Sequence, residues 1–228
     1  MINFHVKNRF TRAVQFTAEI NCLEDDATSK KLCLAVNWAL KNDANLAGAN
    51  LAGAYLAGTY LRGVGFTGAN LEGANLEGAS LGEVNFEGAN LAGVNLRGAY
   101  LAGAYFEGAN LTGAYFEGAN LEGASFEGAY LAGADLAGAS LGGASLGGAN
   151  GINDWVKVIQ IETYAIAYTA EILQIGCEKH PIADWRNFDN RRIAKMDGKT
   201  ALKFWGKYRD WIFQTIELCP AKPTGAKQ

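Results

Sequence analysis

A repeat of five residues runs through the middle of this chain, from Ala44 to Gly148, in twenty-one copies without insertion or deletion. A period of five matches neither the roughly 3.6 residues per turn of an α-helix nor the alternation of a β-strand. A short fixed period instead indicates a solenoid, in which equivalent residues of successive coils stack into one core. The repeat therefore predicts the architecture of nearly half of the 228 residues.

Each copy of the repeat has one large and one small apolar position. The central residue is Leu in sixteen copies and Phe in five, and the residue two places earlier is Ala in seventeen. The residue two places after the centre is Gly in twenty copies, and only Glu83 departs from this rule. We expect the apolar positions to point inward and the Gly to occupy a turn with positive φ or close backbone approach.

These copies resemble the pentapeptide-repeat family, whose pattern is A-(N/D)-L-x-x. The pattern stands here as Ala-Asn-Leu-Ala-Gly at 49–53 and as Ala-Asn-Leu-Glu-Gly at 69–73. The resemblance covers residues 44–150 and implies a mainly β fold, a right-handed quadrilateral β-helix with four copies, or twenty residues, in each coil. Twenty-one copies would form about five coils and a rod about 25 Å long, at roughly 4.8 Å for each coil.

A coil of twenty residues would stack residues that are twenty apart. One face would hold four stacked rings inside the core, with a fifth, Phe116, on the opposite face; the stacked rings are Phe66, Phe86, Phe106 and Phe126. Another face would carry an amide ladder of Asn50, Asn70, Asn90 and Asn110. We expect the rings to pack in the core and the amides to hydrogen bond along the rod.

Outside the face that holds the rings, three carboxylates stack in the same way: Glu87, Glu107 and Glu127. Like charges at this spacing repel. Such a column is either tolerated because it is hydrated or retained for a cationic partner.

Charge is distributed unevenly along the chain, although the whole carries a formal charge of only −3. Residues 44–150 contain nine acidic and two basic residues, a net charge of −7. The first 43 residues have a net charge of +1, and residues 151–228 have a net charge of +3. An acidic rod argues against binding of nucleic acid along its length.

A solenoid needs caps, because each end exposes unpaired backbone and bare apolar side chains. Residues 1–43 are predicted to form such a cap, a β-hairpin followed by a helix. The hairpin is indicated by alternation of Ile2, Phe4 and Val6, and then of Val14, Phe16, Ala18 and Ile20. Asp26 or Thr28 can cap a helix that runs to about Lys41, with Leu40 on its apolar face.

Residues 151–219 are predicted to form an α+β module, and residues 220–228 a disordered tail. The stretch 155–175 suggests two or three strands, Pro181 opens a short helix, and a last helix runs over about 199–218. The last helix carries an apolar stripe that either forms the module's own core or makes a homodimer seam; its members are Leu202, Trp205, Tyr208, Trp211, Ile212 and Ile216.

Parts of both terminal regions are similar to pentapeptide-repeat proteins encoded by phages and prophages. The similarity rests on the hairpin and helix at the start, and on Gly176-Cys177-x-x-His180-Pro181-Ile182, Trp185-x-x-Phe188-Asp189, Ile193-x-x-Met196-Asp197 and Ala201-Leu202 with Trp205. It implies a viral or mobile-element origin.

Motifs that carry chemistry are missing from the sequence. It contains no Ser-centred elbow, phosphate-cradling Gly loop or HExxH pair, so neither an enzyme nor a bound cofactor is predicted. Cys177-x-x-His180 has metal-ligand spacing but lacks a second pair, so no metal site is predicted. Four Cys without disulfide spacing, no leader and no long apolar run predict a cytoplasmic protein that does not contact membranes.

The first functional hypothesis is a binding protein whose rigid acidic rod antagonises a host protein, for example one that handles DNA. Some members of the family resemble duplex DNA and occupy the DNA-binding saddle of gyrase. Duplex DNA carries roughly 15 charges over 25 Å, whereas this rod nets −7. The unbroken register also lacks the projecting loops of the quinolone-protecting relatives, so gyrase itself is a weak expectation.

The second hypothesis places recognition in the C-terminal module and treats the rod as a scaffold. Trp185 lies near a basic cluster of Arg191, Arg192 and Lys195 in the sequence. Arg beside aromatic residues suits a planar anionic ligand. A solvated helix end is the alternative interpretation of the same cluster.

Overall fold

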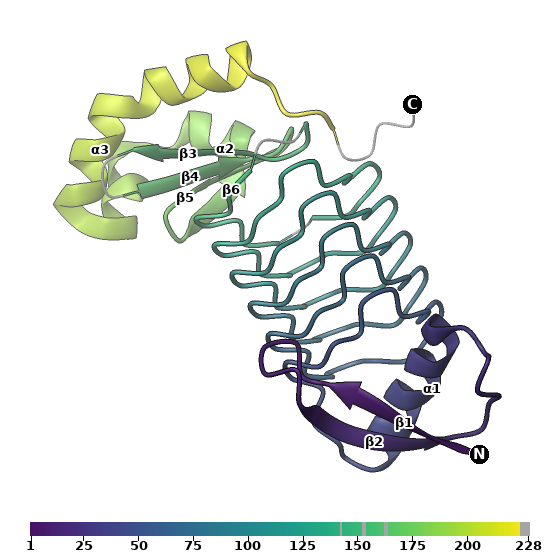
Figure 1. Cartoon of the computed structure of the whole chain (residues 1–228). Helices are drawn as coiled ribbons and strands as arrows, with labels where there is room; N and C mark the ends of the chain where they lie inside the picture. Colours follow the sequence, from purple (N-terminus) through teal and green to yellow (C-terminus); the bar gives the residue numbers. More distant parts are fainter. Residues whose placement is uncertain (142, 152–153, 162–163, 224–228) are drawn as a thin grey trace.

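The computed structural model describes residues 1–141, 143–151, 154–161 and 164–223. Stacked coils form the middle of the molecule, with a hairpin and helix at one end and a sheet with two helices at the other (Figure 1).

Successive coils are joined by backbone hydrogen bonds with a constant offset along the chain. The central Leu51 donates its N–H to Asn70 O at 2.7 Å, and Gly53 donates to Glu72 O at 2.9 Å. In the reverse direction, Asn70 N–H donates to Ala49 O at 2.9 Å. Parallel bridges pair residues twenty apart, from Asn50 with Asn70 to Tyr130 with Asn150. One coil therefore contains twenty residues.

Turns satisfy a further N–H group of each copy, and side chains satisfy another in the copies where Asn or Asp precedes the centre. The residue two places before each centre donates its N–H to the carbonyl of the central residue of the preceding copy, as Ala54 does to Leu51 O at 3.0 Å. Where Asn or Asp precedes the centre, its side chain accepts the N–H two residues on, as Asn75 does from Glu77 at 3.0 Å. The Gly residues of the repeat have φ between 61° and 72°, which explains the preference for Gly, and Glu83 adopts φ 57° at the same position.

The rod contains isolated β-bridges rather than extended strands. Each face reaches a turn after one bridged residue and its neighbour, which is too short for a regular strand. The expectation of a mainly β fold is therefore met only in part, because the named strands of the described chain lie outside the rod.

Stacked aromatic rings fill one side of the core. The ring centroids lie 5.5 Å apart for Phe66 and Phe86, 5.4 Å for Phe86 and Phe106, and 4.8 Å for Phe106 and Phe126. Phe116 reaches across from the opposite face and meets Phe106 and Phe126 edge-on, at 6.0 Å and 6.2 Å. All five rings are buried.

The N-terminal region packs on the first coil. Antiparallel strands β1 (Ile2–Lys7) and β2 (Val14–Ile20) form a hairpin, and α1 (Thr28–Lys41) follows. Buried residues of all three elements share one apolar cluster with the coils. Val14 and Leu40, expected on apolar faces, are exposed. Neither Asp26 nor Thr28 caps α1, whose N-cap is Ala27; Asp26 instead pairs with Lys30 at 2.8 Å.

The C-terminal region contains four strands, three of which lie in the stretch 155–175, where two or three were expected. These are β3 (Lys157–Ile161), β4 (Tyr164–Tyr168), β5 (Ile172–Ile175) and β6 (Glu178–Pro181), antiparallel in that order. Ala167 and Val156 pack against the core of the rod. Ile166 and Tyr168 pack against the helices α2 (Ile182–Asn187) and α3 (Asn190–Leu218). The sheet thus lies between the rod and the helices.

Helix α3 begins at Asn190, nine residues before the start expected from the sequence. Its two halves meet at Asp197 and Gly198, whose backbone is not helical, with φ 55° at Gly198. The break explains why the apolar pattern indicated only the second half.

The predicted disordered tail begins too early. Ala221 is only 6% exposed. Lys222 donates its N–H to Asp154 O at 2.6 Å, and its ammonium pairs with the Asp154 carboxylate at 2.7 Å. These contacts anchor the chain after α3, and residues 224–228 lie outside the described residues.

Truncation of the central ring tests the aromatic stack. Phe106→Ala removes contacts with three other rings and should lower the free energy of unfolding by about 3–5 kcal/mol. Phe106→Leu restores the residue that most copies use and should cost less than about 1.5 kcal/mol. Urea unfolding followed by circular dichroism measures both. Phe10→Ala, at a ring that is 67% exposed, is the control, and an equal loss there would contradict the account.

Substitution of two glycines by Ala separates the effect of a positive φ on stability from the effect of steric crowding. An added Cβ meets nothing within 4 Å at either Gly88 or Gly65. Gly88 has φ 61°, whereas Gly65 lies in a bridge without positive φ. Gly88→Ala should therefore destabilise by about 1–2 kcal/mol. Gly65→Ala should be neutral or stabilise by up to about 1 kcal/mol. Thermal unfolding compares the two, and equal midpoints would show that the turn does not need Gly.

Candidate functional site

The three stacked carboxylates lie outside the Phe stack, one coil apart. Glu87 and Glu127 are exposed and Glu107 is half-buried. Glu127 accepts a hydrogen bond from Ser145 Oγ at 3.2 Å. We call Glu87, Glu107 and Glu127 the Glu column. No Lys, Arg or His of the described chain forms an ion pair with any of these three residues.

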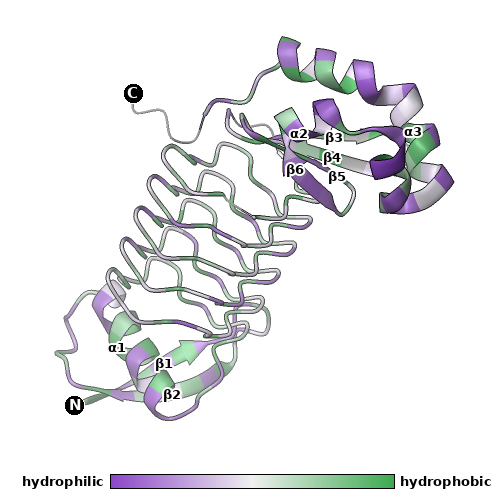
Figure 2. Cartoon of the chain, turned by 180° about the vertical axis from the view of Figure 1, so that it is seen from behind, coloured by the Kyte–Doolittle hydropathy of each residue, from purple (hydrophilic) through white to green (hydrophobic). Residues whose placement is uncertain are grey.

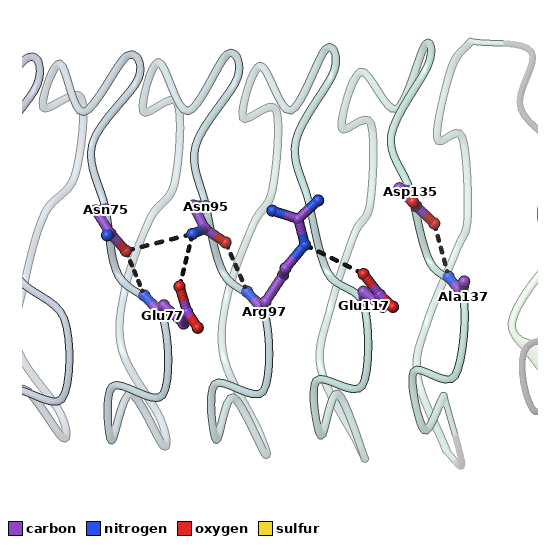
Figure 3. Close-up of polar contacts among 7 residues, drawn as sticks. All are labelled: Asn75, Glu77, Asn95, Arg97, Glu117, Asp135 and Ala137. Atoms are coloured by element: carbon purple, nitrogen blue, oxygen red, sulfur yellow. Dashed lines mark hydrogen bonds and ion pairs between the residues drawn. The ribbon is translucent and has the colours of Figure 1, made fainter.

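Both arginines of the rod are paired on other faces. Arg97 Nε donates to Glu117 Oε2 at 3.2 Å (Figure 3). The Arg97 guanidinium also lies 4.4 Å from the centre of the Tyr115 ring. Arg62 pairs with Glu83 at 2.6 Å. Their charges are therefore engaged away from the Glu column.

Three of the remaining carboxylates of the rod, on other faces, accept hydrogen bonds from the next coil. Asn95 Nδ2 donates to Glu77 Oε2 at 3.1 Å and to Asn75 Oδ1 at 3.4 Å (Figure 3). Glu72 and Glu122 accept from Asn90 and Ser140 in the same manner, both at 3.1 Å. Acidic residues thus lie on several faces of the rod, and the Glu column is the one set of them that stacks over three successive coils.

The Glu column ends at the C-terminal sheet. Ser145, which binds Glu127, lies 3.4 Å from Gln174 Nε2 of β5. The buried Gln174 accepts the Leu146 N–H at 2.9 Å. Lys179 Nζ donates to Ala144 O at 2.9 Å and to Gly143 O, and burial lowers the pKa of this ammonium. These contacts join the module to the last coil.

Trp185 cannot serve as the exposed contact that the sequence suggests. It is only 2% exposed, and its Nε1 donates to Leu173 O at 2.7 Å. Its ring packs against Trp205 at 5.1 Å between centroids. Trp185 therefore belongs to the core of the module, beneath the surface on which the basic cluster lies, and not to an exposed contact surface.

The basic cluster itself is exposed on the first half of α3. Arg191, Arg192 and Lys195 all face water. Arg192 lies 5.4 Å from the centre of the Phe188 ring, and its Nη2 lies 3.4 Å from His180 Nε2. Beyond the kink, Lys199, Lys203 and Lys207 are also exposed, so the basic surface is longer than the sequence analysis proposed.

Cys177 and His180 have metal-ligand spacing in the sequence, and the described part of the chain shows which side chains surround them. No three His, Cys, Asp or Glu side chains gather there. His180 lies 3.1 Å from Glu178 Oε2, and its ring meets Phe188 edge-on at 5.0 Å. β6, which carries Glu178 and His180, is coloured as hydrophilic in Figure 2.

The apolar stripe of the last helix mainly forms the core of the module. Trp205 and Ile212 are buried, and the half-buried Leu202, Tyr208 and Ile216 pack against them. Trp211, at 44% exposed, is the member that a homodimer seam would have to use.

A small cavity in this core was not expected from the sequence. It measures about 40 Å³, and its lining includes Trp185, Trp205 and Met196. At its edge Tyr164 Oη donates to Asp197 Oδ2 at 2.5 Å. Burial and this carboxylate raise the pKa of Tyr164 to about 12. The volume is well below the roughly 300 Å³ of a ligand pocket.

A second unexpected feature lies at the N-terminal end of the rod. Three cationic residues of the hairpin, Lys7, Arg9 and Arg12, line one cavity with the first two amides of the Asn ladder. Sequence spacing predicted the ladder, whose hydrogen bonds the structure confirms, but not that the hairpin loop folds over its end.

Among the described residues, the helices are all too short or too polar to cross a membrane.

Three solved structures show what this chain is similar to. A pentapeptide repeat protein (Rfr23) from Cyanothece 51142 is 29% identical, over 46% of this chain and 91% of that one, with a TM-score of 0.25. One from the Arabidopsis thaliana thylakoid lumen is 31% identical, over 46% and 63%, with a TM-score of 0.24. HetL from Nostoc sp. strain PCC 7120, involved in heterocyst differentiation regulation, is 36% identical, over 46% and 52%, with a TM-score of 0.19.

The last two matches thus span less than two thirds of those chains. No curated protein matches the sequence. The family description "Pentapeptide repeats (8 copies)" matches residues 42–78, 79–118 and 114–150, which together span the coils. Residues 42–150 of this chain therefore belong to the pentapeptide-repeat family.

Proposed function

We propose that the chain is a non-enzymatic binding protein whose Glu column contacts a cationic surface of a protein partner. The observation that carries the proposal is the run of Glu87, Glu107 and Glu127, one coil apart and without an ion pair in the described structure. Three like charges held this closely repel one another. A cationic partner would relieve that repulsion.

The coil supports this proposal because it holds the carboxylates on rigid backbone. Each Glu follows a buried Phe whose N–H donates to the next coil, at 2.7 Å for both Phe86 and Phe106. Family membership supports a right-handed coil and a binding role. Since the backbone is already ordered, binding would cost little conformational entropy beyond that of the Glu side chains.

The charge density limits the kind of partner. The rod nets −7, against roughly 15 charges for 25 Å of duplex DNA. Its carboxylates are also spread over several faces and partly hydrogen bonded. We therefore propose a partner that needs a short acidic run, rather than full replacement of DNA in a gyrase-like saddle. The resemblance of the termini to phage proteins makes an antagonist of a host protein, acting in the host cytoplasm, the fitting biological role.

A second candidate function is supported by the basic surface of α3. Arg191, Arg192 and Lys195 are exposed, and the nearby Asp197 is occupied by Tyr164. In this alternative the rod is a scaffold and these three side chains hold a small planar anion. Phe188, beneath Arg192, supplies the aromatic surface in place of the buried Trp185.

Neutralisation of the Glu column tests the first function. The triple variant Glu87→Gln, Glu107→Gln and Glu127→Gln should lose the protein partners that wild type captures from bacterial lysate. The matched control is Glu72→Gln, Glu77→Gln and Glu122→Gln, which removes the same charge from other faces and should retain them. Quantitative mass spectrometry of captured proteins at low and moderate salt is the measurement. Equal capture by both variants, or none by wild type, would contradict the proposal.

The second function is tested on α3. Arg191→Ala, Arg192→Ala and Lys195→Ala together should weaken binding of naphthalene sulfonate by about tenfold or more, the effect of one lost charged hydrogen bond. Titration calorimetry measures the affinity, and Lys30→Ala, Lys31→Ala and Lys41→Ala on α1 serve as the charge-matched control. Unchanged affinity in the α3 variant would rule out this site.

A further inference from the structure

The Asn ladder has a fixed polarity. In each member, Oδ1 accepts the backbone N–H two residues later, at 3.5 Å for Asn50, 3.3 Å for Asn70 and Asn90, and 3.2 Å for Asn110. This local bond identifies the oxygen of every side-chain amide. The amide nitrogen must therefore point toward the preceding coil.

Hydrogen bonds along the ladder follow this polarity. Nδ2 donates to Oδ1 of the preceding member at 3.0 Å from Asn70 to Asn50, 3.0 Å from Asn90 to Asn70 and 3.2 Å from Asn110 to Asn90. Asn50 is the first member, and its Nδ2 has no acceptor within the described chain. At the next level strand β1 replaces a coil, since Asn50 N–H donates to Lys7 O at 2.8 Å.

The free end of the ladder opens into a surface cavity of about 370 Å³. The residues that line it are Lys7, Asn8, Arg9, Arg12, Asn50 and Asn70, without a carboxylate. Arg9 is held in place, because its Nη1 donates to Ala69 O at 2.9 Å and its guanidinium lies 4.5 Å from the centre of the Phe10 ring. Three cations and an unpaired donor thus share one space.

Both the ladder and its surroundings make this space electropositive. Four amides aligned head to tail place the positive end of their dipoles at Asn50, as a helix does at its N-terminus. The carboxylate of Glu72 follows Asn70 in the chain but accepts from Asn90, one coil farther from the hairpin. The Glu72 carboxylate is therefore hydrogen bonded away from the cavity.

We propose that this cavity binds a phosphoryl group, either as free phosphate or as part of a phosphorylated small molecule. A phosphoryl dianion offers several acceptor oxygens, which match the guanidinium groups of Arg9 and Arg12, the Lys7 ammonium and the Asn50 amide. The site is separate from the Glu column, so it stands independently of the partner proposed above.

Inorganic phosphate is the probe that tests the site in the full chain. Titration calorimetry should show saturable binding at one site, and the Asn50 side-chain amide should shift in nitrogen–proton correlation spectra. Asn50→Asp keeps an oxygen that can accept from Asn70 but removes the donor and adds a negative charge, so binding should be lost. Its thermal unfolding midpoint should stay near that of wild type, which shows that the fold is retained.

A pair of charge-matched variants separates the site from general electrostatics. Arg12 adopts φ 61°, which Asn tolerates well, so Arg12→Asn removes the charge without straining the backbone. It should weaken phosphate binding by about tenfold, whereas Lys41→Gln on α1 should leave it unchanged. The proposal is overturned if wild type does not bind phosphate, if Asn50→Asp binds as tightly as wild type, or if both charge variants weaken binding equally.

The source of the phosphoryl group is settled by a second titration, with adenosine monophosphate. Tighter binding than that of inorganic phosphate assigns the site to a phosphorylated molecule, and weaker binding assigns it to the free ion. Either result should be abolished by Asn50→Asp. Binding of adenosine monophosphate that survives this substitution would overturn the assignment.

Discussion

The hydrogen bond from each central N–H to the carbonyl nineteen residues later is the constraint on which the rest of the structure depends. It holds at 2.7 Å for Leu51, Leu71 and Leu91 alike. Because every copy has the same length, the offset never changes, and equivalent positions of successive coils form columns. What stands in a column is then decided by spacing in the sequence alone.

The physical consequence of a column depends on the side chain that is repeated. Rings stack at 4.8 to 5.5 Å and fill the core, and amides polarise one another in a chain of hydrogen bonds. Carboxylates gain nothing from each other, so the Glu column depends on water or on a partner. The same geometry that stabilises the rod thus places like charges together in the Glu column. It also aligns the amide dipoles of the Asn ladder toward one end of the rod.

Most of the rod could be predicted from sequence, because the period, the inward Leu and Phe, and the Gly turns are all local patterns. The terminal regions could not be predicted in the same detail. The kink at Asp197 and Gly198 hid the first half of α3, and the burial of Trp185 depends on its contacts with Leu173 of β5 and Trp205 of α3. The cavity at Asn50 depends on where the hairpin loop meets the coil. The spacing of residues in the sequence does not indicate this position.

Scalar couplings across hydrogen bonds, measured by nuclear magnetic resonance on protein labelled with nitrogen-15 and carbon-13, test the coil most directly. The account predicts a coupling from the Leu71 amide nitrogen to the Asn90 carbonyl carbon, and the same from Leu91 to Asn110. It also predicts that the amide nitrogens of Leu71 and Leu91 couple to no other carbonyl carbon. A coupling from either amide to a carbonyl at a different offset would contradict a coil of twenty residues, and with it every column on which the proposed sites rest.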